Sequence, residues 1–115
     1  MTNHVLYNIV YTVKTVGKAF EFEWDKGNIN KNVKHNVEDR EAEQVFFDEG
    51  KLVIEDEKHS TNEERFMLLG KTKSGGKLSI IYTLRGGKVR IISARDMNKK
   101  ERRKYEEEFQ NDTQV

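Results

Sequence analysis

Two glycine pairs constrain the fold of this chain more than any other feature, because each marks a tight turn between two strand-like segments. Gly75-Gly76 and Gly86-Gly87 both interrupt runs of apolar residues, and glycine pairs at such places favour β-hairpins. Strands are expected at residues 64–71, 77–84 and 89–94. Since strands joined by hairpins run antiparallel, the second half of the chain predicts an antiparallel sheet.

The first half of the chain predicts two more strands and two short helices. Residues 20–24 alternate between aromatic and acidic side chains, which is typical of a half-buried strand, and a short strand is expected at 51–55. Helices are predicted at 26–36 and 38–47. For residues 1–19 the alternation is irregular, so that an edge strand, an ordered tail and a mobile extension all remain open.

A third helix completes the predicted fold. It is expected from Asn98 to about Phe109, because Asn98 is a good N-cap residue and Glu101 completes an approximate capping box. The predicted order is β-α-α-β-β-β-β-α. This order predicts an α+β protein, in which a small antiparallel sheet of about four to five strands is packed on one face by two N-terminal helices and a C-terminal helix.

Length and composition narrow the class of protein. The chain has 115 residues, which suits a single domain, and it contains no cysteine. The absence of cysteine excludes a disulfide scaffold, a thiolate zinc site, an iron–sulfur cluster and a cysteine nucleophile. No apolar run reaches the roughly 18 residues of a membrane-spanning helix, and no signal-peptide pattern is visible. We therefore expect a cytoplasmic protein without membrane contact.

Charge is distributed unevenly, although the whole chain carries a net charge of only +1. Residues 38–65 hold eleven acidic and four basic side chains, whereas residues 71–104 hold twelve basic and two acidic ones. These blocks therefore carry net charges of −7 and +10. A basic block of this size is typical of a surface that meets a polyanion such as RNA. The alternative is a solvated face that the acidic block balances in the folded protein.

A first group of polar residues is a candidate for chemistry at the entry of a predicted strand. His59 and Ser60 are followed closely by Glu63, Glu64 and Arg65. This group combines an imidazole, a hydroxyl, carboxylates and a guanidinium, which together are able to act on a phosphodiester. The alternative is that the junction is polar only because it is exposed to solvent.

A second candidate group is the pair Arg90 and Arg95. On a flat strand these side chains point to opposite faces, because their spacing of five is odd, unless Arg95 lies past the strand end. Adjacent Ile91 and Ile92 indicate a strand that is buried on both faces. The alternative is structural: both arginines brace the acidic helix, and Glu64 pairs with one of them.

Neither a metal nor a cofactor is expected. The three histidines lack the close ligand spacing of a metal site. The chain contains no phosphate-binding loop motif, and its glycine pairs are better explained as turns.

Several short motifs follow one another along the chain at a distinctive spacing. They are Phe22-Glu-Trp-Asp25, Asn32-Val-Lys-His35, Val45-Phe-Phe-Asp48, His59-Ser60, Glu63-Glu-Arg65, Arg90-Ile-Ile-Ser-Ala-Arg95, and Glu101-Arg102 with Tyr105. This ordered set resembles the BrnT family of toxins from type II toxin–antitoxin systems, over roughly residues 20–107. The chain departs from the family pattern at Lys26, where a proline is usual, and at Asn36, where a glycine is usual. Residues 1–19 form an extension longer than the family needs.

The resemblance implies a fold, an activity and a partner. The fold is RelE-like, in a single toxin domain at residues 20–110. The activity is that of a ribonuclease that blocks translation. The partner is a BrnA-like antitoxin, a DNA-binding protein that holds the toxin and represses its own operon.

Metal-independent RNA cleavage assigns roles to the candidate residues. A base helps the 2′-hydroxyl attack the adjacent phosphate, an acid protonates the leaving 5′-oxygen, and the products are a 2′,3′-cyclic phosphate and a 5′-hydroxyl. We assign the base to Glu64 or His35, and the acid to His59 or Tyr105.

Cations must stabilise the charge that develops on the phosphate. We assign this role to Arg65, Arg90 and Arg95, because a guanidinium binds phosphate through two parallel hydrogen bonds. Further basic side chains are assigned to RNA binding: Lys34, Lys88, Lys99, Arg102 and Arg103.

Two other functions remain open. A non-catalytic RNA- or DNA-binding module would bind RNA in a salt-dependent manner without cleaving it. A degenerate toxin would act only through a complex with an antitoxin. That antitoxin is expected either to cover the basic block with acidic patches or to bind the acidic block through a basic surface.

Overall fold

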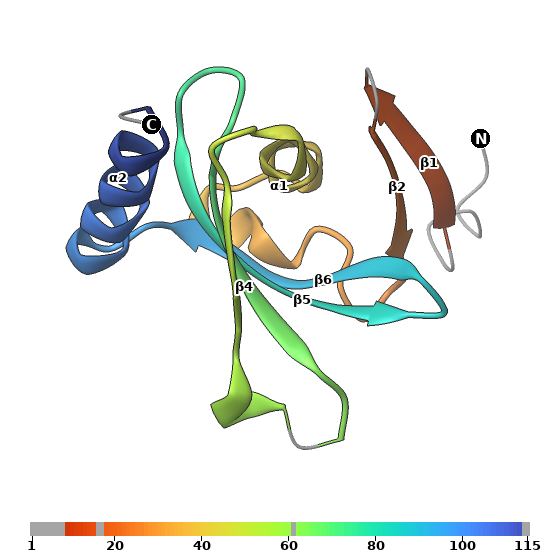
Figure 1. The fold of residues 1–115 in the computed structure, drawn as a ribbon. Coiled ribbons are helices and arrows are strands. Elements are labelled where there is room, and N and C mark those ends of the chain that lie inside the picture. Colours follow the sequence, from red (N-terminus) through yellow and green to blue (C-terminus); the bar gives the residue numbers. More distant parts are fainter. Residues whose placement is uncertain (1–8, 16–17, 61, 114–115) are drawn as a thin grey trace.

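The computed structural model describes residues 9–15, 18–60 and 62–113 as a sheet with helices on both faces (Figure 1). The elements in chain order are β1 (Ile9–Thr15), β2 (Lys18–Trp24), the 3-10 helix η2 (Lys31–His35), α1 (Asp39–Gln44), the 3-10 helix η3 (Val45–Phe47), β3 (Leu52–Glu55), the 3-10 helix η4 (Glu57–His59), β4 (Arg65–Lys71), β5 (Lys77–Arg85), β6 (Lys88–Asp96) and α2 (Lys99–Thr113). The predicted α+β class and the strands of the second half are confirmed. In the described part of the chain, no helix has the length and apolar character needed to cross a membrane.

The sheet formed by the described residues is mixed, with six strands in the order β1-β2-β6-β5-β4-β3. Strands β3 to β6 pair antiparallel, and the glycine pairs predict the pairings of β4 with β5 and of β5 with β6. Strand β2 instead pairs parallel with β6, where Phe22 lies beside Val89. The prediction of a wholly antiparallel sheet of four to five strands is therefore wrong. Turn residues specify only strands that are neighbours in sequence, whereas β2 reaches β6 through a long crossover that no turn residue marks.

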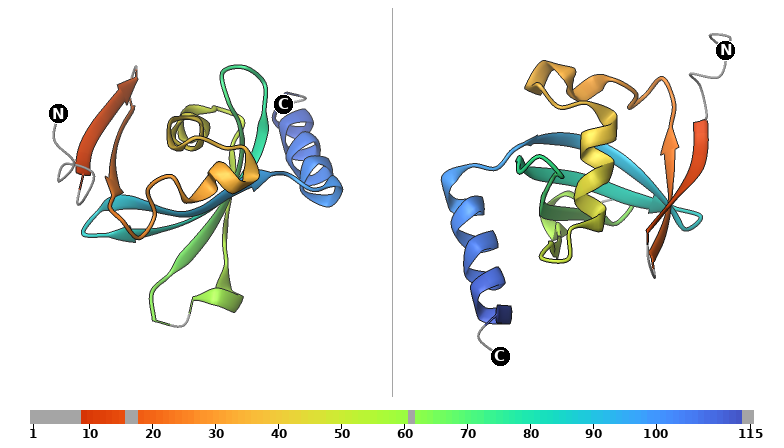
Figure 2. Two further views of the ribbon diagram at one scale, coloured as in Figure 1. Left: turned by 180° about the vertical axis from the view of Figure 1, so that it is seen from behind. Right: turned by 90° about the horizontal axis from the view of Figure 1, so that it is seen from above.

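The N-terminal part of the chain contributes an edge strand. Residues Ile9–Thr15 form β1, which pairs antiparallel with β2 along its whole length. Ile9 lies opposite Trp24 at one end, and Thr15 lies opposite Lys18 at the other. The pair stands at one end of the molecule, and α2 stands at the other (Figure 2). The remainder of the predicted extension, residues 1–8 and 16–17, lies outside the described residues.

The helix predicted at 26–36 is wrong, because this segment follows the edge of the sheet instead. The Nδ2 of Asn28 donates to the carbonyl oxygens of Glu23 and Ile91, each at 3.0 Å. The Oδ1 of Asn32 accepts the backbone N–H of Ala94 at 2.9 Å. These side chains replace the neighbouring strand that β6 lacks once β2 has diverged, and they satisfy buried backbone groups. The helical part of this segment is limited to the short 3-10 helix η2, which contains Asn32.

The other two predicted helices form with adjusted ends. Residues 38–47 fold as α1 followed by η3, and a capping box forms between Glu38 and Glu41. Helix α2 extends to Thr113, beyond the predicted end near Phe109.

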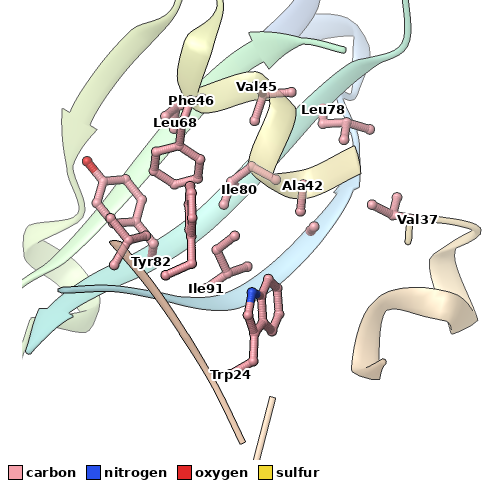
Figure 3. Packing of buried hydrophobic residues seen from close by; sticks show 13 residues of the cluster. Trp24, Val37, Ala42, Val45, Phe46, Leu68, Leu78, Ile80, Tyr82 and Ile91 are labelled. Carbon is pink, nitrogen blue, oxygen red and sulfur yellow. The ribbon is translucent and has the colours of Figure 1, made fainter. Parts of the chain in front are cut away.

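The main core lies between α1 and one face of the sheet (Figure 3). The Phe46 ring packs edge-on against Phe22 and Tyr82, with ring centroids 5.3 and 5.0 Å apart. The Nε1 of Trp24 donates to the buried Glu43 carboxylate at 2.7 Å, which fixes α1 over β2.

Helix α2 covers the opposite face of the sheet, so the prediction that all helices pack on one face is wrong. Tyr105 is buried with Leu69 and Met97, and partly buried Leu52 and Met67 pack beside them. Successive residues of β4 point to opposite faces, so Leu68 joins the main core and Leu69 joins α2. Beyond α2, this face of the sheet carries the site described next.

Candidate active site

A β-bulge in β6 brings Arg90 and Arg95 to the same face of the sheet. The pairing with β5 passes directly from Ile91 to Ser93, so Ile92 is an extra residue. This residue compensates for the odd spacing of the two arginines, since side chains alternate along a regular strand. The expectation of opposite faces is corrected because β6 is not a flat strand, and Arg95 lies within β6 rather than past its end.

An open cleft of about 570 Å³ lies on this face. Its floor is a row of residues that pair with one another across four strands: Ile54 of β3, Met67 of β4, Ile81 of β5 and Ser93 of β6. Ile92 lines the cleft beside this row, and Glu55 and Asp56 bring acidic residues to it.

The cleft holds two of the predicted catalytic arginines on opposite sides of its floor. Arg65 lies two residues before Met67 on β4, and Arg95 lies two residues after Ser93 on β6. Strands β4 and β6 run in the same direction, because each is antiparallel to β5. The two guanidiniums therefore flank an apolar floor diagonally, which suits a ligand that carries both a phosphate and a base.

Arg95 is held by α2 while its side chain stays 44% exposed. Its Nη1 and Nη2 atoms donate to the Oε1 and Oε2 of Glu101 at 2.8 and 3.0 Å. These hydrogen bonds raise the pKa of Arg95 although burial opposes the rise. Burial favours a higher pKa for Glu101, but Arg95 and the N–H of Asn98 outweigh burial and lower it. Both groups are therefore charged at neutral pH.

Arg90 is enclosed, in contrast, and does not line the cleft. Its side chain is 12% exposed, and Nη1 and Nη2 donate to the two carboxylate oxygens of Asp25 at 2.9 Å each. Nη1 also donates to Glu23 at 3.4 Å. The hydrogen bond from Arg90 lowers the pKa of the Asp25 carboxyl below its ordinary value, against a smaller opposing effect of burial. This geometry is that of a brace between β6 and the segment after β2.

The polar group at 59–65 borders the cleft through the connection between β3 and β4. His59 ends η4, and the hydroxyl of Ser60 donates to the Asp56 carbonyl oxygen at 2.6 Å. The same hydroxyl accepts the N–H of Arg65 at 2.9 Å, so Ser60 shapes the entry of β4. Glu64 is exposed directly before Arg65. Among the described residues, the Arg65 guanidinium has neither a hydrogen bond nor an ion pair.

A family model for BrnT, the ribonuclease toxin of type II toxin–antitoxin systems, matches residues 24–101. This match spans more than half of the chain and includes every residue that lines the cleft. The chain belongs to the BrnT family. It is accordingly a ribonuclease toxin of a system that also contains an antitoxin. No curated protein matches the sequence.

Two further residues predicted to take part in BrnT chemistry lie away from the cleft, which Arg90 and Glu64 do not line either. Tyr105 is buried under α2, where its hydroxyl donates to Asp48 at 2.6 Å. Burial and the Asp48 carboxylate both raise the pKa of Tyr105 well above its ordinary value. His35 is exposed at the end of η2. Neither residue lines the cleft.

The basic residues predicted to bind RNA are spread over the BrnT domain rather than gathered in one place. Lys99, Arg102 and Arg103 are exposed on the first turns of α2. Lys88 begins β6 at the end far from α2, and Lys34 is exposed on η2. None of the five lines the cleft.

The sequence interpretation placed Glu101 in a capping box and in a family motif, but it missed the ion pair of Glu101 with Arg95. The capping box itself forms, with the Asn98 N–H donating to Glu101 at 2.9 Å. The adjacent Ile91 and Ile92, from which burial on both faces was predicted, coincide with the bulge. No group of three or more metal-ligating side chains occurs in the part of the chain that is described.

Proposed function

We propose that this protein is a metal-independent endoribonuclease that blocks translation in the cytoplasm, with the cleft between Arg65 and Arg95 as its active site. One observation carries the proposal: two guanidiniums from different strands flank one open apolar floor. A phosphate held by one of them leaves room for a neighbouring base on the floor. We also propose that the fold is related to that of RelE-like toxins.

The arginines would supply electrostatic stabilisation. When the 2′-hydroxyl attacks, negative charge accumulates on the non-bridging oxygens of the phosphate, and a guanidinium at hydrogen-bond distance lowers the energy of that state. Arg95 is 44% exposed and Arg65 is half-buried, so both remain accessible to RNA. Arg90 is omitted from this role because Asp25 and Glu23 already occupy it.

The base and the acid are proposed from the connection between β3 and β4. Glu64 stands next to Arg65, and His59 belongs to the turn that follows the cleft residue Asp56. Glu64 would take the proton from the 2′-hydroxyl, and His59 would give one to the 5′-oxygen. The products are then a 2′,3′-cyclic phosphate and a 5′-hydroxyl. His35 and Tyr105 are not part of this scheme because of where they lie.

The partners follow from the same scheme. RNA is the proposed substrate, with Lys34, Lys88, Lys99, Arg102 and Arg103 providing contacts to its backbone outside the cleft. A BrnA-like, DNA-binding antitoxin is the proposed inhibitor, and it would act by covering the cleft. Acidic groups on its surface would complement the net charge of +10 on residues 71–104.

The test is cleavage of purified total RNA in EDTA and without ribosomes. Wild-type protein should cleave and leave cyclic-phosphate ends, whereas Arg65→Ala/Arg95→Ala should lose roughly 100-fold or more of the rate, the usual cost of removing groups that stabilise transition-state charge. The matched control is Arg40→Ala/Lys31→Ala, which also removes two cations but from exposed positions outside the cleft. It should cleave like wild type.

The outcome also separates the alternatives. RNA binding without cleavage would establish a binding module, and the absence of both would leave a protein that acts through its antitoxin complex. Equal cleavage by wild type and the Arg65→Ala/Arg95→Ala variant would place the active site elsewhere.

A further inference from the structure

We propose that Glu101, at the start of α2, is a positioning residue that presents one edge of the Arg95 guanidinium to the RNA phosphate. This inference rests on the proposed function of the cleft. It assigns to α2 a part in the activity, beyond covering the sheet.

The hydrogen bonds of Arg95 leave one edge of its guanidinium open. An arginine side chain has five N–H donors. Nη1 uses both of its donors, on Glu101 Oε1 at 2.8 Å and on the carbonyl oxygen of Asp96 at 3.0 Å. Nη2 uses one donor, on Glu101 Oε2 at 3.0 Å. The two remaining donors are the Nε–H and the second N–H of Nη2, and they have no acceptor among the described residues.

These two donors form a fork suited to phosphate. The Nε–H and the second Nη2–H lie side by side on the same edge of the planar group and point in parallel. Two oxygens of a phosphate match that spacing, as in other paired arginine–phosphate contacts. Glu101 thus occupies the end of the guanidinium and leaves the side edge for the ligand.

The carboxylate is the fixed partner in this ion pair. Glu101 is 12% exposed, whereas Arg95 is 44% exposed. Oε1 accepts the N–H of Asn98 at 2.9 Å, and Oε2 accepts the hydroxyl of Ser79 at 3.4 Å. The N–H of Glu101 in turn donates to Asn98 Oδ1 at 2.8 Å.

This asymmetry favours positioning over inhibition. A carboxylate that blocked Arg95 until RNA arrived would have to leave, and Glu101 would then lose its contacts to the helix cap and to β5. A carboxylate that stays in place instead limits the guanidinium to one orientation. Since correct orientation matters most in the transition state, we expect the loss of Glu101 to lower kcat more than it raises KM.

The experiment compares Glu101→Gln with wild type on a short defined RNA in EDTA. Glutamine keeps the capping interaction of this position but offers Arg95 only one acceptor oxygen and no charge. We expect kcat to fall about tenfold, KM to change less than about threefold, and the melting temperature to stay within a few degrees. In an Arg95→Lys background, Glu101→Gln should have almost no further effect on kcat, because lysine cannot form the fork.

The matched control is Asn98→Ala. This change removes the side chain that caps α2 while leaving both carboxylate oxygens on Arg95. It should lower the melting temperature and leave kcat within about twofold of wild type.

Three results would overturn the inference. An active Glu101→Gln enzyme with unchanged kcat would show that orientation is set by other groups. A raised kcat would show that Glu101 competes with phosphate. If Glu101→Gln and Asn98→Ala both lowered kcat and the melting temperature to a similar extent, Glu101 would act only as a capping residue. A wild-type protein that cleaves no RNA would fail the proposed function itself and this inference with it, which is a distinct outcome.

Discussion

Arg90 and Arg95 share a strand, a face of the sheet and a type of partner, yet they lie in very different surroundings. Each guanidinium donates through Nη1 and Nη2 to a single carboxylate, Asp25 in one case and Glu101 in the other. The Arg90 side chain is 12% exposed and that of Arg95 is 44% exposed. The same pairing therefore produces a closed brace in one place and an accessible cation in the other.

Backbone packing accounts for the difference. A methyl group at Gly27 would lie only 2.7 Å from Nη2 of Arg90, which shows how closely the chain passes over this guanidinium. Glu23 adds a second carboxylate beside Nη1. Arg95 instead borders the cleft. The lesson is that an arginine's partner does not decide its function, whereas the accessibility of its remaining donors does.

The position of the brace explains what it stabilises. Strands β2 and β6 are joined at the register pair of Phe22 and Val89, and the chain leaves β2 directly afterwards. The ion pair between Arg90 and Asp25 fastens this departing segment to β6. The two asparagines that follow then bond to the edge of β6.

The largest effect should come from Arg90→Ala. The change leaves the carboxylates of Asp25 and Glu23 close together and without their cation, so we expect a loss of about 2–3 kcal/mol and a melting temperature lower by roughly 10 °C. Arg95→Ala should cost less than about 1 kcal/mol, because its guanidinium is partly solvated. Thermal unfolding of both variants checks this prediction. Equal decreases in melting temperature would show that Arg90 and Arg95 do not differ in their contribution to stability.

A smaller effect is expected from Gly27→Ala, which tests the close passage of the backbone. The new methyl group would lie 2.7 Å from Arg90 Nη2 and 3.0 Å from Asp25 Oδ1, so the ion pair must move. We expect destabilisation of about 1 kcal/mol, at the low end of the range for adding a carbon at a close contact, because Gly27 itself is exposed.

The control for this change is the same substitution in an Arg90→Ala background, followed by urea unfolding. With the guanidinium gone, only the 3.0 Å contact with Asp25 Oδ1 remains, so Gly27→Ala should destabilise the protein clearly less than in the wild-type background. If Gly27→Ala lowers the free energy of unfolding equally in both backgrounds, Gly27 is needed for the conformation of its own loop and not to make room for Arg90.

Local features of the fold could be predicted from sequence, and long-range ones could not. The turns at the two glycine pairs and the capping box at Asn98 depend on neighbouring residues, and all of them form. The contacts of Asn28 and Asn32 with β6 join residues 63 and 62 positions apart. No local pattern encodes such a contact, and for that reason the segment at 26–36 was interpreted as a helix.

The same division holds for the site. The residue types and motifs singled out Arg65, Arg90 and Arg95 together, and the structure places the first and last at one cleft. Arg90 does not line the cleft, and it pairs instead with Asp25, which lies 65 positions away. The common face of Arg90 and Arg95 depends on a bulge, which shows in the sequence only as adjacent isoleucines.

The smallest expected effect is a pH dependence of the brace. The pKa of Asp25 is lowered in the folded protein, chiefly by its hydrogen bonds with Arg90. A carboxyl group with a lowered folded pKa contributes stability above its unfolded pKa, near 4, and this contribution is lost as the pH falls through the folded value. The difference in the free energy of unfolding between wild type and Arg90→Ala, measured with urea, should therefore be constant from pH 7 to 5 and become smaller below about pH 4.

This difference should not fall to zero at low pH, because the Arg90 side chain also contributes packing. The lowered pKa of Glu101 affects both proteins alike and cancels in the difference. A difference that stayed constant down to pH 3 would show that Asp25 gains nothing from Arg90, and the contrast with Arg95 would then rest on burial alone.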